Sequence, residues 1–303
     1  MTTSSVASGP ATGRAKAAQF LALTKPRVIE LLLIATVPSM VLASDGHPSW
    51  GLVVATLVAG ALAAGSANAI NCYIDRDIDA LMNRTRSRPL VRKDLVSPRE
   101  ALVFGVTLAI AANVVFITAV NWQSALLADA AIAIYLGIYS LFLKRRTSLN
   151  IVIGGIAGCM PALIGWTAVT GGIGAPALVI FLIIFLWTPP HTWALAIKYA
   201  DDYRRAGVPM LPVVAPARTV TRQMLVYTVL CLGAAAGLGV VADLSPFYLI
   251  VSAPTALWFL WSVIRLHFTA HQGGPLKPMP VFMASNLFLA VTFITASVDS
   301  LAR

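Results

Sequence analysis

The sequence predicts an all-α, polytopic membrane protein in which nine helices form a bundle around a substrate cavity. Of its 303 residues, 58% are hydrophobic and only 11% are charged, and the mean hydropathy is +0.81. This composition is typical of a chain that crosses a bilayer several times. The net charge of +10 does not indicate nucleic-acid binding, because no basic, aromatic-rich soluble region accompanies it.

Nine apolar stretches are long enough to span a membrane as helices. We expect them at about residues 27–44, 50–71, 99–119, 123–143, 149–171, 175–197, 221–242, 246–266 and 280–298. Of the 22 Lys and Arg residues, only Arg303 falls outside one set of alternate loops. The positive-inside rule explains this alternation if nine spans are present. It places the N-terminus in the cytoplasm and the C-terminus across the cell inner (plasma) membrane.

The remaining organisation is simple. Residues 1–24 are small and polar and lack the apolar core of a signal peptide, so we expect a flexible cytoplasmic tail. Residues 25–303 should form one membrane domain. Cys72, Cys159 and Cys231 are far apart, which indicates neither a zinc site nor a disulfide framework.

A charged segment follows the second span and reads NCYIDRDIDALMNRTRSRPL, residues 71–90. Asn71, Asp75 and Asp79 are four residues apart, so they share one face of a helix, and Asp77 points the opposite way. Two carboxylates and an amide offer the oxygen ligands that Mg²⁺ prefers, and Mg²⁺ commonly bridges carboxylates to phosphates. The candidate donors to phosphate oxygens are Arg84, Arg86, Arg88, Lys144, Arg145 and Arg146.

The sixth span ends on the same side of the membrane, in a second acidic segment at Asp201 and Asp202. The chain has only 12 acidic residues, and five of them stand at positions 75, 77, 79, 201 and 202. The plain alternative for both segments is a helix end that reaches water. Cation binding explains better why carboxylates are concentrated on one face of the membrane.

These features resemble the UbiA-type intramembrane prenyltransferases. The resemblance rests on the NxxxDxxxD pattern, the second acidic segment and the nine spans. It implies that residues 25–303 form one prenyltransferase domain, which binds a prenyl diphosphate with Mg²⁺ and transfers the prenyl group to an acceptor. It also implies catalytic roles for Asn71, Asp75, Asp79 and Asp202. The implied metal ligands are Asn71, Asp75, Asp79, Asp201 and Asp202.

Four stretches further resemble the branch of this family that farnesylates heme. They are LTKPRVIELLL, residues 71–90, LKRRTSLNIVIGGIAGCMPALIGW and PPHTWALAIKYADDYRRAGVPMLPVV. This resemblance implies that farnesyl diphosphate and heme B are substrates, heme B not being a cofactor. The farnesyl group and water add to a vinyl group, giving heme O and diphosphate. Downstream partners would be a heme-modifying enzyme or assembly factors of terminal oxidases.

One departure from the family pattern concerns the second motif. Many members carry DxxxD there, whereas this chain reads KYADD, with Lys198 in place of the first aspartate. The number of magnesium ions, one or two, therefore stays open. Lys198 is instead a candidate contact for the diphosphate.

Three further polar residues have open roles. His191, within the sixth span, is either a ligand of heme iron or a hydrogen-bonding residue in a helix interrupted by proline. Asp129 either lines the cavity or forms an interhelical hydrogen bond. We expect Glu30 to pair locally with Lys25 or Arg27. Close helix packing is the expected role of Gly154, Gly155 and Gly158.

Two other functions are alternatives to heme farnesylation. One is prenyl transfer to an aromatic acceptor such as a quinone precursor. The other is ion-coupled transport, which favours ionisable groups near the middle of the membrane. The acidic residues instead gather at one end beside many arginines, an arrangement better suited to a diphosphate anion.

Overall fold

The computed structural model describes residues 13–92 and 95–302, apart from the side chains of residues 27, 28 and 30–34. Within these limits the chain forms helices and no strands, as the sequence predicts. The long helices are α2 (Pro26–Ala43), α3 (Trp50–Ile74), α6 (Pro98–Ala119), α7 (Trp122–Ala133) continued by the π-helix η1 (Ile134–Leu143), α8 (Asn150–Thr170), α9 (Ala175–Lys198), α12 (Ala217–Val241), α13 (Pro246–His271) and α14 (Met279–Leu301).

Eight of these described segments, all except α2, are long and apolar enough to cross a membrane. They coincide with eight of the nine expected spans. The first expected span coincides with α2, an 18-residue helix of which several side chains lie outside the described part. The prediction of a polytopic helical membrane protein is therefore confirmed.

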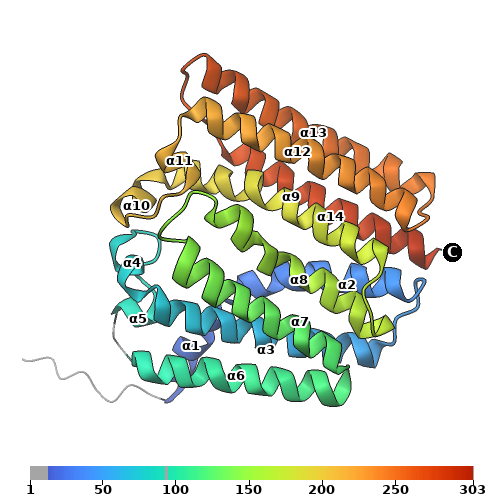
Figure 1. Cartoon of the computed structure of the whole chain (residues 1–303), viewed down its shortest axis with the longest axis horizontal. Helices are drawn as coiled ribbons and strands as arrows, with labels where there is room; N and C mark the ends of the chain where they lie inside the picture. The colour runs from blue at the N-terminus through green and yellow to red at the C-terminus, as the bar shows by residue number, and fades with distance from the viewer. Residues whose placement is uncertain (1–12, 93–94, 303) are drawn as a thin grey trace, which may run out of the picture.

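Short helices connect the long ones at one end of the bundle (Figure 1). They are α4 (Arg76–Leu81), α5 (Pro89–Arg92), α10 (Ala200–Arg205) and α11 (Leu211–Val214). The two acidic segments belong to α4 and α10. The fold thus brings together two parts of the chain that are more than a hundred residues apart in the sequence.

The structure differs from the expected flexible tail over its second half. Gly13–Thr24 forms helix α1, and Leu23 is fully buried against Ala69 and Cys72 of α3. The amide of Asn68 donates to the carbonyl oxygen of Thr24 at 2.9 Å, which fixes the end of α1. Residues 1–12 lie outside the described part.

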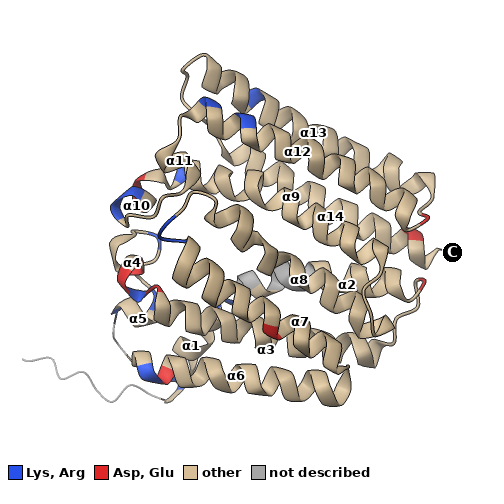
Figure 2. Ribbon diagram, viewed as in Figure 1, with Lys and Arg blue, Asp and Glu red and all other residues tan. Residues whose placement is uncertain are grey.

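Charged residues follow the expected asymmetry. Lys and Arg gather toward the end that carries α4 and α10, whereas acidic residues are the charges visible at the opposite end (Figure 2). Between the ends, the outer surface is apolar: Val103 and Ile110 of α6 are each 61% exposed and Ile117 is 60% exposed. Such side chains suit contact with lipid hydrocarbon, where every backbone polar group must be satisfied within the helix.

Small residues allow helices α2 and α8 to approach closely. A Cβ atom on Gly165 would overlap the carbonyl oxygen of Thr36. Nearby, the Ser39 hydroxyl donates to the carbonyl oxygen of Ala162 at 2.6 Å. Interhelical hydrogen bonds of this kind contribute about 0.6 kcal/mol each, so close packing is the larger stabilising effect.

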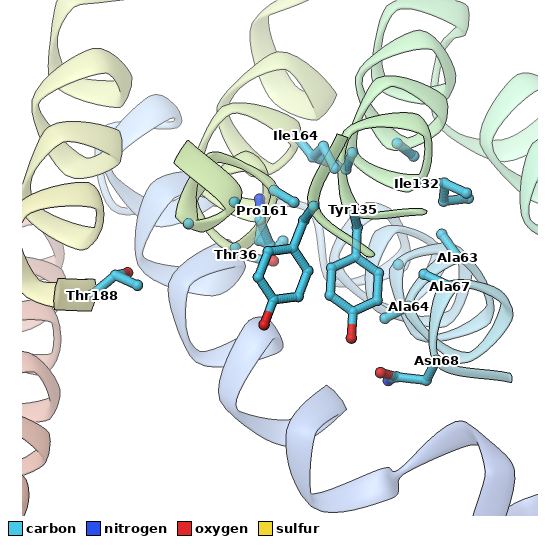
Figure 3. Close-up of a pocket in the computed structure, with 18 of the residues that line it drawn as sticks. Thr36, Ala63, Ala64, Ala67, Asn68, Ile132, Tyr135, Pro161, Ile164 and Thr188 are labelled. Carbon is cyan, nitrogen blue, oxygen red and sulfur yellow. The ribbon is translucent and has the colours of Figure 1, made fainter. Parts of the chain in front are cut away.

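The first half of the bundle encloses an apolar cavity of about 320 Å³ (Figure 3). Its wall comes from α2, α3, α7 with η1, α8 and α9. Small residues such as Ala63, Ala67 and Gly158 leave the space open, and a Cβ atom at Gly158 would meet nothing within 4 Å. Asn68 and Tyr135 supply polar atoms to the lining. A cavity of this size is within the range of small-molecule sites.

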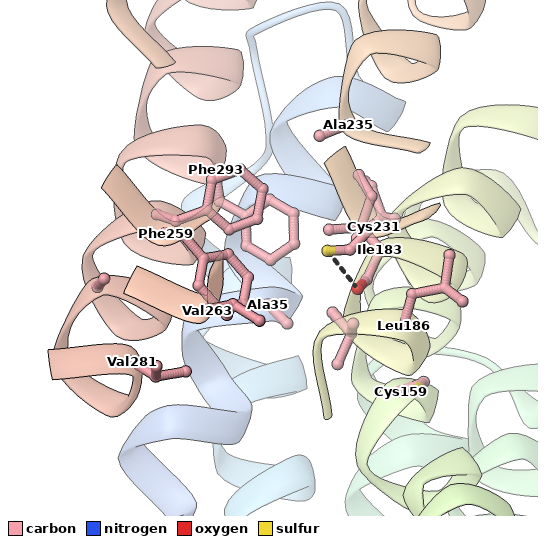
Figure 4. Packing of buried hydrophobic residues seen from close by; sticks show 14 of the residues in the cluster. Ala35, Cys159, Ile183, Leu186, Cys231, Ala235, Phe259, Val263, Val281 and Phe293 are labelled. Carbon is pink, nitrogen blue, oxygen red and sulfur yellow. Dashed lines mark hydrogen bonds between the residues drawn. The ribbon is translucent and has the colours of Figure 1, made fainter. Parts of the chain in front are cut away.

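Helices α9, α12, α13 and α14 pack around an aromatic and aliphatic core (Figure 4). Phe259 and Phe288 lie with ring centroids 5.7 Å apart, and Ile183 is fully buried. The thiol of Cys231 lies 3.4 Å from the carbonyl oxygen of Ile183. All three cysteines are free and buried.

Candidate active site

The acidic face predicted from the sequence forms where α3 meets α4. Asp75, with φ −89° and ψ 3°, joins the two helices. Backbone bonds from Asp75 N to Asn71 O (2.9 Å) and from Asp79 N to Asp75 O (2.8 Å) preserve the four-residue spacing across the junction. Asn71, Asp75 and Asp79 are therefore buried on one side, and Asp77 is exposed on the other.

Asp75 is fully buried and lies among polar partners. Its Oδ2 atom accepts hydrogen bonds from Lys144 Nζ at 2.5 Å and from Asn71 Nδ2 at 2.7 Å. Its Oδ1 atom has no hydrogen-bond partner among the described residues. Because an unsatisfied buried carboxylate oxygen is costly, this atom is a candidate ligand for a cation or for a donor on a substrate.

Asp79 forms a second buried ion pair one turn further along. Its Oδ2 atom lies 2.5 Å from Arg88 NH1, and its side chain is only 4% exposed. The Thr85 hydroxyl donates to the carbonyl oxygen of Asp79 at 2.8 Å. The chain between α4 and α5 is thus folded back, which brings Arg88 to the acidic face.

Lys25 adds a third cation from the junction of α1 and α2. Its ammonium group donates to Asn71 Oδ1 at 2.9 Å. Desolvation, with smaller contributions from Arg88 and Lys144, lowers the pKa of Lys25 to about 8. Its backbone is left-handed (φ 52°), a conformation that costs about 1–3 kcal/mol in a non-glycine residue and that occurs often at functional sites.

The π-helix η1 brings its polar groups to the same place. Lys144 N donates to Tyr139 O, five residues back, at 2.8 Å. The Ser140 hydroxyl donates to Tyr135 O at 2.8 Å and accepts from Asn71 Nδ2 at 2.9 Å. Since π-helical segments within helices occur frequently at functional sites, η1 supports the presence of a functional site here.

The charged site adjoins one end of the apolar cavity. Asn68, which lines the cavity, precedes Asn71 by three residues on α3, so the two lie on neighbouring turns. Tyr135 and Tyr139 of η1 also line the cavity, with ring centroids 5.7 Å apart. An amphipathic molecule with an anionic head and an apolar tail fits this combination of cations and cavity.

The second acidic segment contributes Asp202 to this region. The carboxylate of Asp202 is 9% exposed, pairs with Arg205 and accepts from the Arg84 backbone N–H at 3.2 Å. It therefore ties α10 to the loop that follows α4. Asp201 pairs at the surface with Arg204, with its side chain 82% exposed, and Lys198 is also exposed.

The other predicted diphosphate contacts face outward. Arg145 binds Asp77 with both of its terminal nitrogens, at 2.6 and 2.7 Å, and this hydrogen bonding lowers the pKa of Asp77 to about 2. Arg84 NH2 lies 3.2 Å from the Tyr203 hydroxyl. Arg146 lies over the Phe142 ring at 4.5 Å. The exposed side chain of Arg86 has no polar partner among the described residues.

His191 occupies a separate position between α9 and α14. Its Nδ1 atom lies 2.9 Å from the Ser285 hydroxyl, and its ring stacks on Trp187 with centroids 4.0 Å apart. Thr188, three residues earlier, lines the cavity, whereas His191 itself is not among the lining residues and lies about one helical turn away.

The remaining open roles have these outcomes. Asp129 accepts an interhelical hydrogen bond from Asn113 Nδ2 at 2.8 Å and is not among the cavity-lining residues. Gly154 packs closely against Tyr139, and a Cβ on Gly155 would lie 3.1 Å from Thr188. All three glycines line the cavity, and a Cβ atom on Gly158 would meet nothing within 4 Å. The pairs expected for Glu30 and Arg27 lie outside the described side chains.

The acidic face offers oxygen ligands for a magnesium ion. No group of three or more His, Cys, Asp or Glu side chains among the described residues could hold a metal ion. Asp75 and Asp79 still supply hard oxygen atoms, including the unpartnered Asp75 Oδ1. Because Mg²⁺ is commonly held by one or two carboxylates together with substrate phosphates and waters, these two residues fit a site that the substrate completes.

Several residues of this site were not found from the sequence. Lys25, Asn68 and Ser140 contact or adjoin the acidic face from the junction of α1 and α2, from α3 and from η1. Only Lys25 carried a signal, because it stands inside the stretch LTKPRVIELLL that resembles the family.

The membrane bundle holds buried carboxylates and cations beside an apolar cavity. This combination defines a class of membrane enzyme that binds a substrate with an anionic head and an apolar tail. The sequence pattern of the UbiA prenyltransferase family matches residues 32–287. The chain belongs to that family and is a prenyltransferase.

Similar proteins agree with this assignment. A Frankia casuarinae protein is 53% identical over 287 residues, which cover 95% of this chain and 99% of that protein. A Streptomyces avermitilis protein is 48% identical over 305 residues, covering 100% and 99%. Both are named protoheme IX farnesyltransferase.

Solved structures show the same fold. A UbiA homolog from Archaeoglobus fulgidus, bound to GPP and Mg²⁺, has a TM-score of 0.64 and 19% identity. The match covers 92% of this chain and 99% of that one. The apo UbiA homolog from Aeropyrum pernix has a TM-score of 0.68 at 20% identity, covering 91% and 98%.

Proposed function

We propose that this enzyme transfers the farnesyl group of farnesyl diphosphate to a vinyl group of heme B, with addition of water. The products would be heme O and diphosphate. The observation that carries this proposal is identity of about half of the residues, over nearly the whole chain, to proteins named protoheme IX farnesyltransferase. The charged site beside an apolar cavity supports it chemically.

The proposal divides the site between the diphosphate and the isoprenoid. Lys25, Arg88 and Lys144 are the cations that would bind the diphosphate oxygens. Arg88 and Lys144 would exchange their ion pairs within the protein for ion pairs with the substrate. No buried cation is then left without a partner. The apolar cavity would take the farnesyl tail, because alanine and glycine side chains leave room for it.

Asp75 and Asp79 are the residues that would hold Mg²⁺, with Asn71 beside them. When bound, Mg²⁺ supplies positive charge against the negative charge of the departing diphosphate. Asp202 would act indirectly, by holding the Arg84 backbone and thus the loop that carries Arg88.

The proposed chemistry begins when the C–O bond of farnesyl diphosphate breaks and its electron pair leaves with the diphosphate. Lys144 and Arg88, already bound to the diphosphate oxygens, would stabilise the negative charge that grows on them as the bond lengthens. The allylic carbon then bonds to the terminal carbon of the heme vinyl group. A water oxygen adds to the inner vinyl carbon, and one proton is released.

The acceptor would lie on the side of the cavity next to α9, where His191 is a candidate ligand of the heme iron. We further propose that the charged site faces the cytoplasm and that the C-terminus lies across the inner membrane, because Lys and Arg gather at the end that carries the site. Downstream partners would be a heme-modifying enzyme or oxidase assembly factors that accept the product.

A comparison of two acceptors tests this function. Purified enzyme in detergent would receive farnesyl diphosphate and Mg²⁺ with either heme B or an aromatic quinone precursor. We expect a heme product heavier by a farnesyl group and water, and its hydroxyl oxygen should carry label from labelled water. Conversion of only the aromatic acceptor would contradict the heme assignment while leaving the family unchanged.

A further inference from the structure

His191 is held by an unusual set of contacts between α9 and α14. The indole ring of Trp187 stacks on the imidazole at 4.0 Å with an interplanar angle of 21°. The Phe282 ring lies 4.6 Å away from it. Trp187 also donates its indole N–H to the Ser285 carbonyl oxygen at 2.8 Å, which joins the two helices at this point. The imidazole therefore has little freedom to rotate.

The hydrogen bonds around Ser285 favour a proton on Nδ1 of His191. Ser285 has one hydroxyl proton, which it donates to the carbonyl oxygen of Phe282 at 2.8 Å. With that proton donated to the carbonyl, its oxygen is free to accept a hydrogen bond from His191 Nδ1, 2.9 Å away. In a neutral imidazole, a proton on Nδ1 leaves a lone pair on Nε2.

The other nitrogen, Nε2, is available for an external partner. No hydrogen bond to it occurs within the described part of the chain. His191 is only partly buried, and Thr188, three residues before it, lines the cavity. A metal-bound histidine commonly donates its second ring N–H to a fixed oxygen acceptor, and Ser285 supplies that acceptor here.

We propose that Ser285 is a positioning residue for the acceptor: it holds His191 with the proton on Nδ1, so that Nε2 binds the heme iron. This inference rests on the proposed function, because it takes heme as the acceptor. The Ser285 hydroxyl acts through the imidazole and does not touch the substrate. The iron would thereby be anchored on α9, about one helical turn from Thr188 of the cavity lining.

Heme binding to purified enzyme in detergent tests the proposal. Wild type would be compared with Ser285→Ala, Ser285→Thr, His191→Ala and Ser297→Ala. Ser297 is a matched control on the same helix, because its hydroxyl also donates to a backbone carbonyl, that of Phe293, at 2.9 Å. Titration gives the affinity for heme B, and resonance Raman spectra of the dithionite-reduced complex give the iron–histidine stretch. Size-exclusion chromatography checks that each variant is folded.

We expect Ser285→Ala to bind heme about 10- to 100-fold more weakly than wild type, the usual effect of losing the outer partner of a metal-bound histidine. Its iron–histidine stretch should shift, because Nδ1 has lost its acceptor. Ser285→Thr, which keeps the hydroxyl, should restore both values. His191→Ala should lose the stretch altogether, and Ser297→Ala should match wild type.

The proposal is overturned if the stretch survives in His191→Ala, or if Ser285→Ala matches wild type in both affinity and stretch. Absence of heme binding by the wild type would overturn it as well. The proposed function is judged separately, by turnover of heme B with farnesyl diphosphate. Wild type that ligates heme through His191 without converting it would refute the function and keep the inference. Conversion of heme B without ligation by His191 would support the function and refute the inference.

Discussion

Replacing Asp75 by asparagine is the most informative single change at the candidate site. The side chain keeps its shape and one oxygen, but it loses the negative charge that faces Lys144 at 2.5 Å. If Asp75 holds the magnesium that opposes the diphosphate charge, turnover should fall by about 100- to 1000-fold. Loss of one preorganised electrostatic contact typically has this effect, ~3–4 kcal/mol.

The same change should leave the enzyme folded. It deprives Lys144 of its partner, and breaking a buried ion pair costs about 3–5 kcal/mol. Lys144 retains 14% exposure, so we expect the low end of that range, about 3 kcal/mol. Such a loss is smaller than the ~5–15 kcal/mol stability of a typical domain, and activity should fall far more than folding.

The assay is release of diphosphate from farnesyl diphosphate in the presence of heme B, with Asp77→Asn as the matched control. Asp77 lies on the opposite side of the same short helix and pairs with Arg145 at the surface, where such pairs contribute about 0–1 kcal/mol. We expect its turnover to stay within about twofold of wild type. Comparable turnover in Asp75→Asn and wild type, or equal losses in both variants, would refute the assignment.

Two further predictions concern substrate affinity and packing. Arg88→Met, which removes the partner of Asp79, should raise the KM for farnesyl diphosphate by about 10- to 100-fold, because a charge-assisted hydrogen bond contributes ~1.5–3 kcal/mol. An unchanged KM would remove Arg88 from the diphosphate site. Gly154→Ala should lower stability by about 1–3 kcal/mol, since the added methyl group overlaps the Tyr139 ring. Thermal unfolding in detergent measures this loss. In the control variant Gly237→Ala, the added methyl group meets nothing within 4 Å, so its stability should match wild type.

The sequence was sufficient to predict the spans and the acidic face. Long apolar stretches and alternating positive loops report directly on how the chain crosses a bilayer. Asn71, Asp75 and Asp79 were predictable because a four-residue spacing survives the junction between α3 and α4. These features depend on local periodicity, which a single sequence contains.

The sequence was not sufficient to separate Lys144 from Arg145 and Arg146. The three are consecutive, and only the π-helical turn before them directs Lys144 to Asp75 and Arg145 to Asp77. The π-helical turn changes the direction in which the following side chains point. No residue type in IYLGIYSLFL requires a π-helix.

Contacts over long sequence distances were also beyond prediction. Lys25 reaches Asn71 across 46 residues from a left-handed backbone position, and Ser285 reaches His191 across 94 residues. Helix periodicity says which face a residue occupies, but it does not say which helix lies opposite.

A magnesium titration shows directly whether farnesyl transfer to heme depends on a metal held at Asp75. Purified enzyme treated with EDTA would receive farnesyl diphosphate, heme B and increasing Mg²⁺, and diphosphate release and heme product would be measured together. We expect no product without Mg²⁺, recovery as it is added, and equal amounts of diphosphate and farnesylated heme. Full product formation in EDTA, or Mg²⁺-dependent diphosphate release with heme B left unchanged, would contradict magnesium-dependent farnesyl transfer to heme.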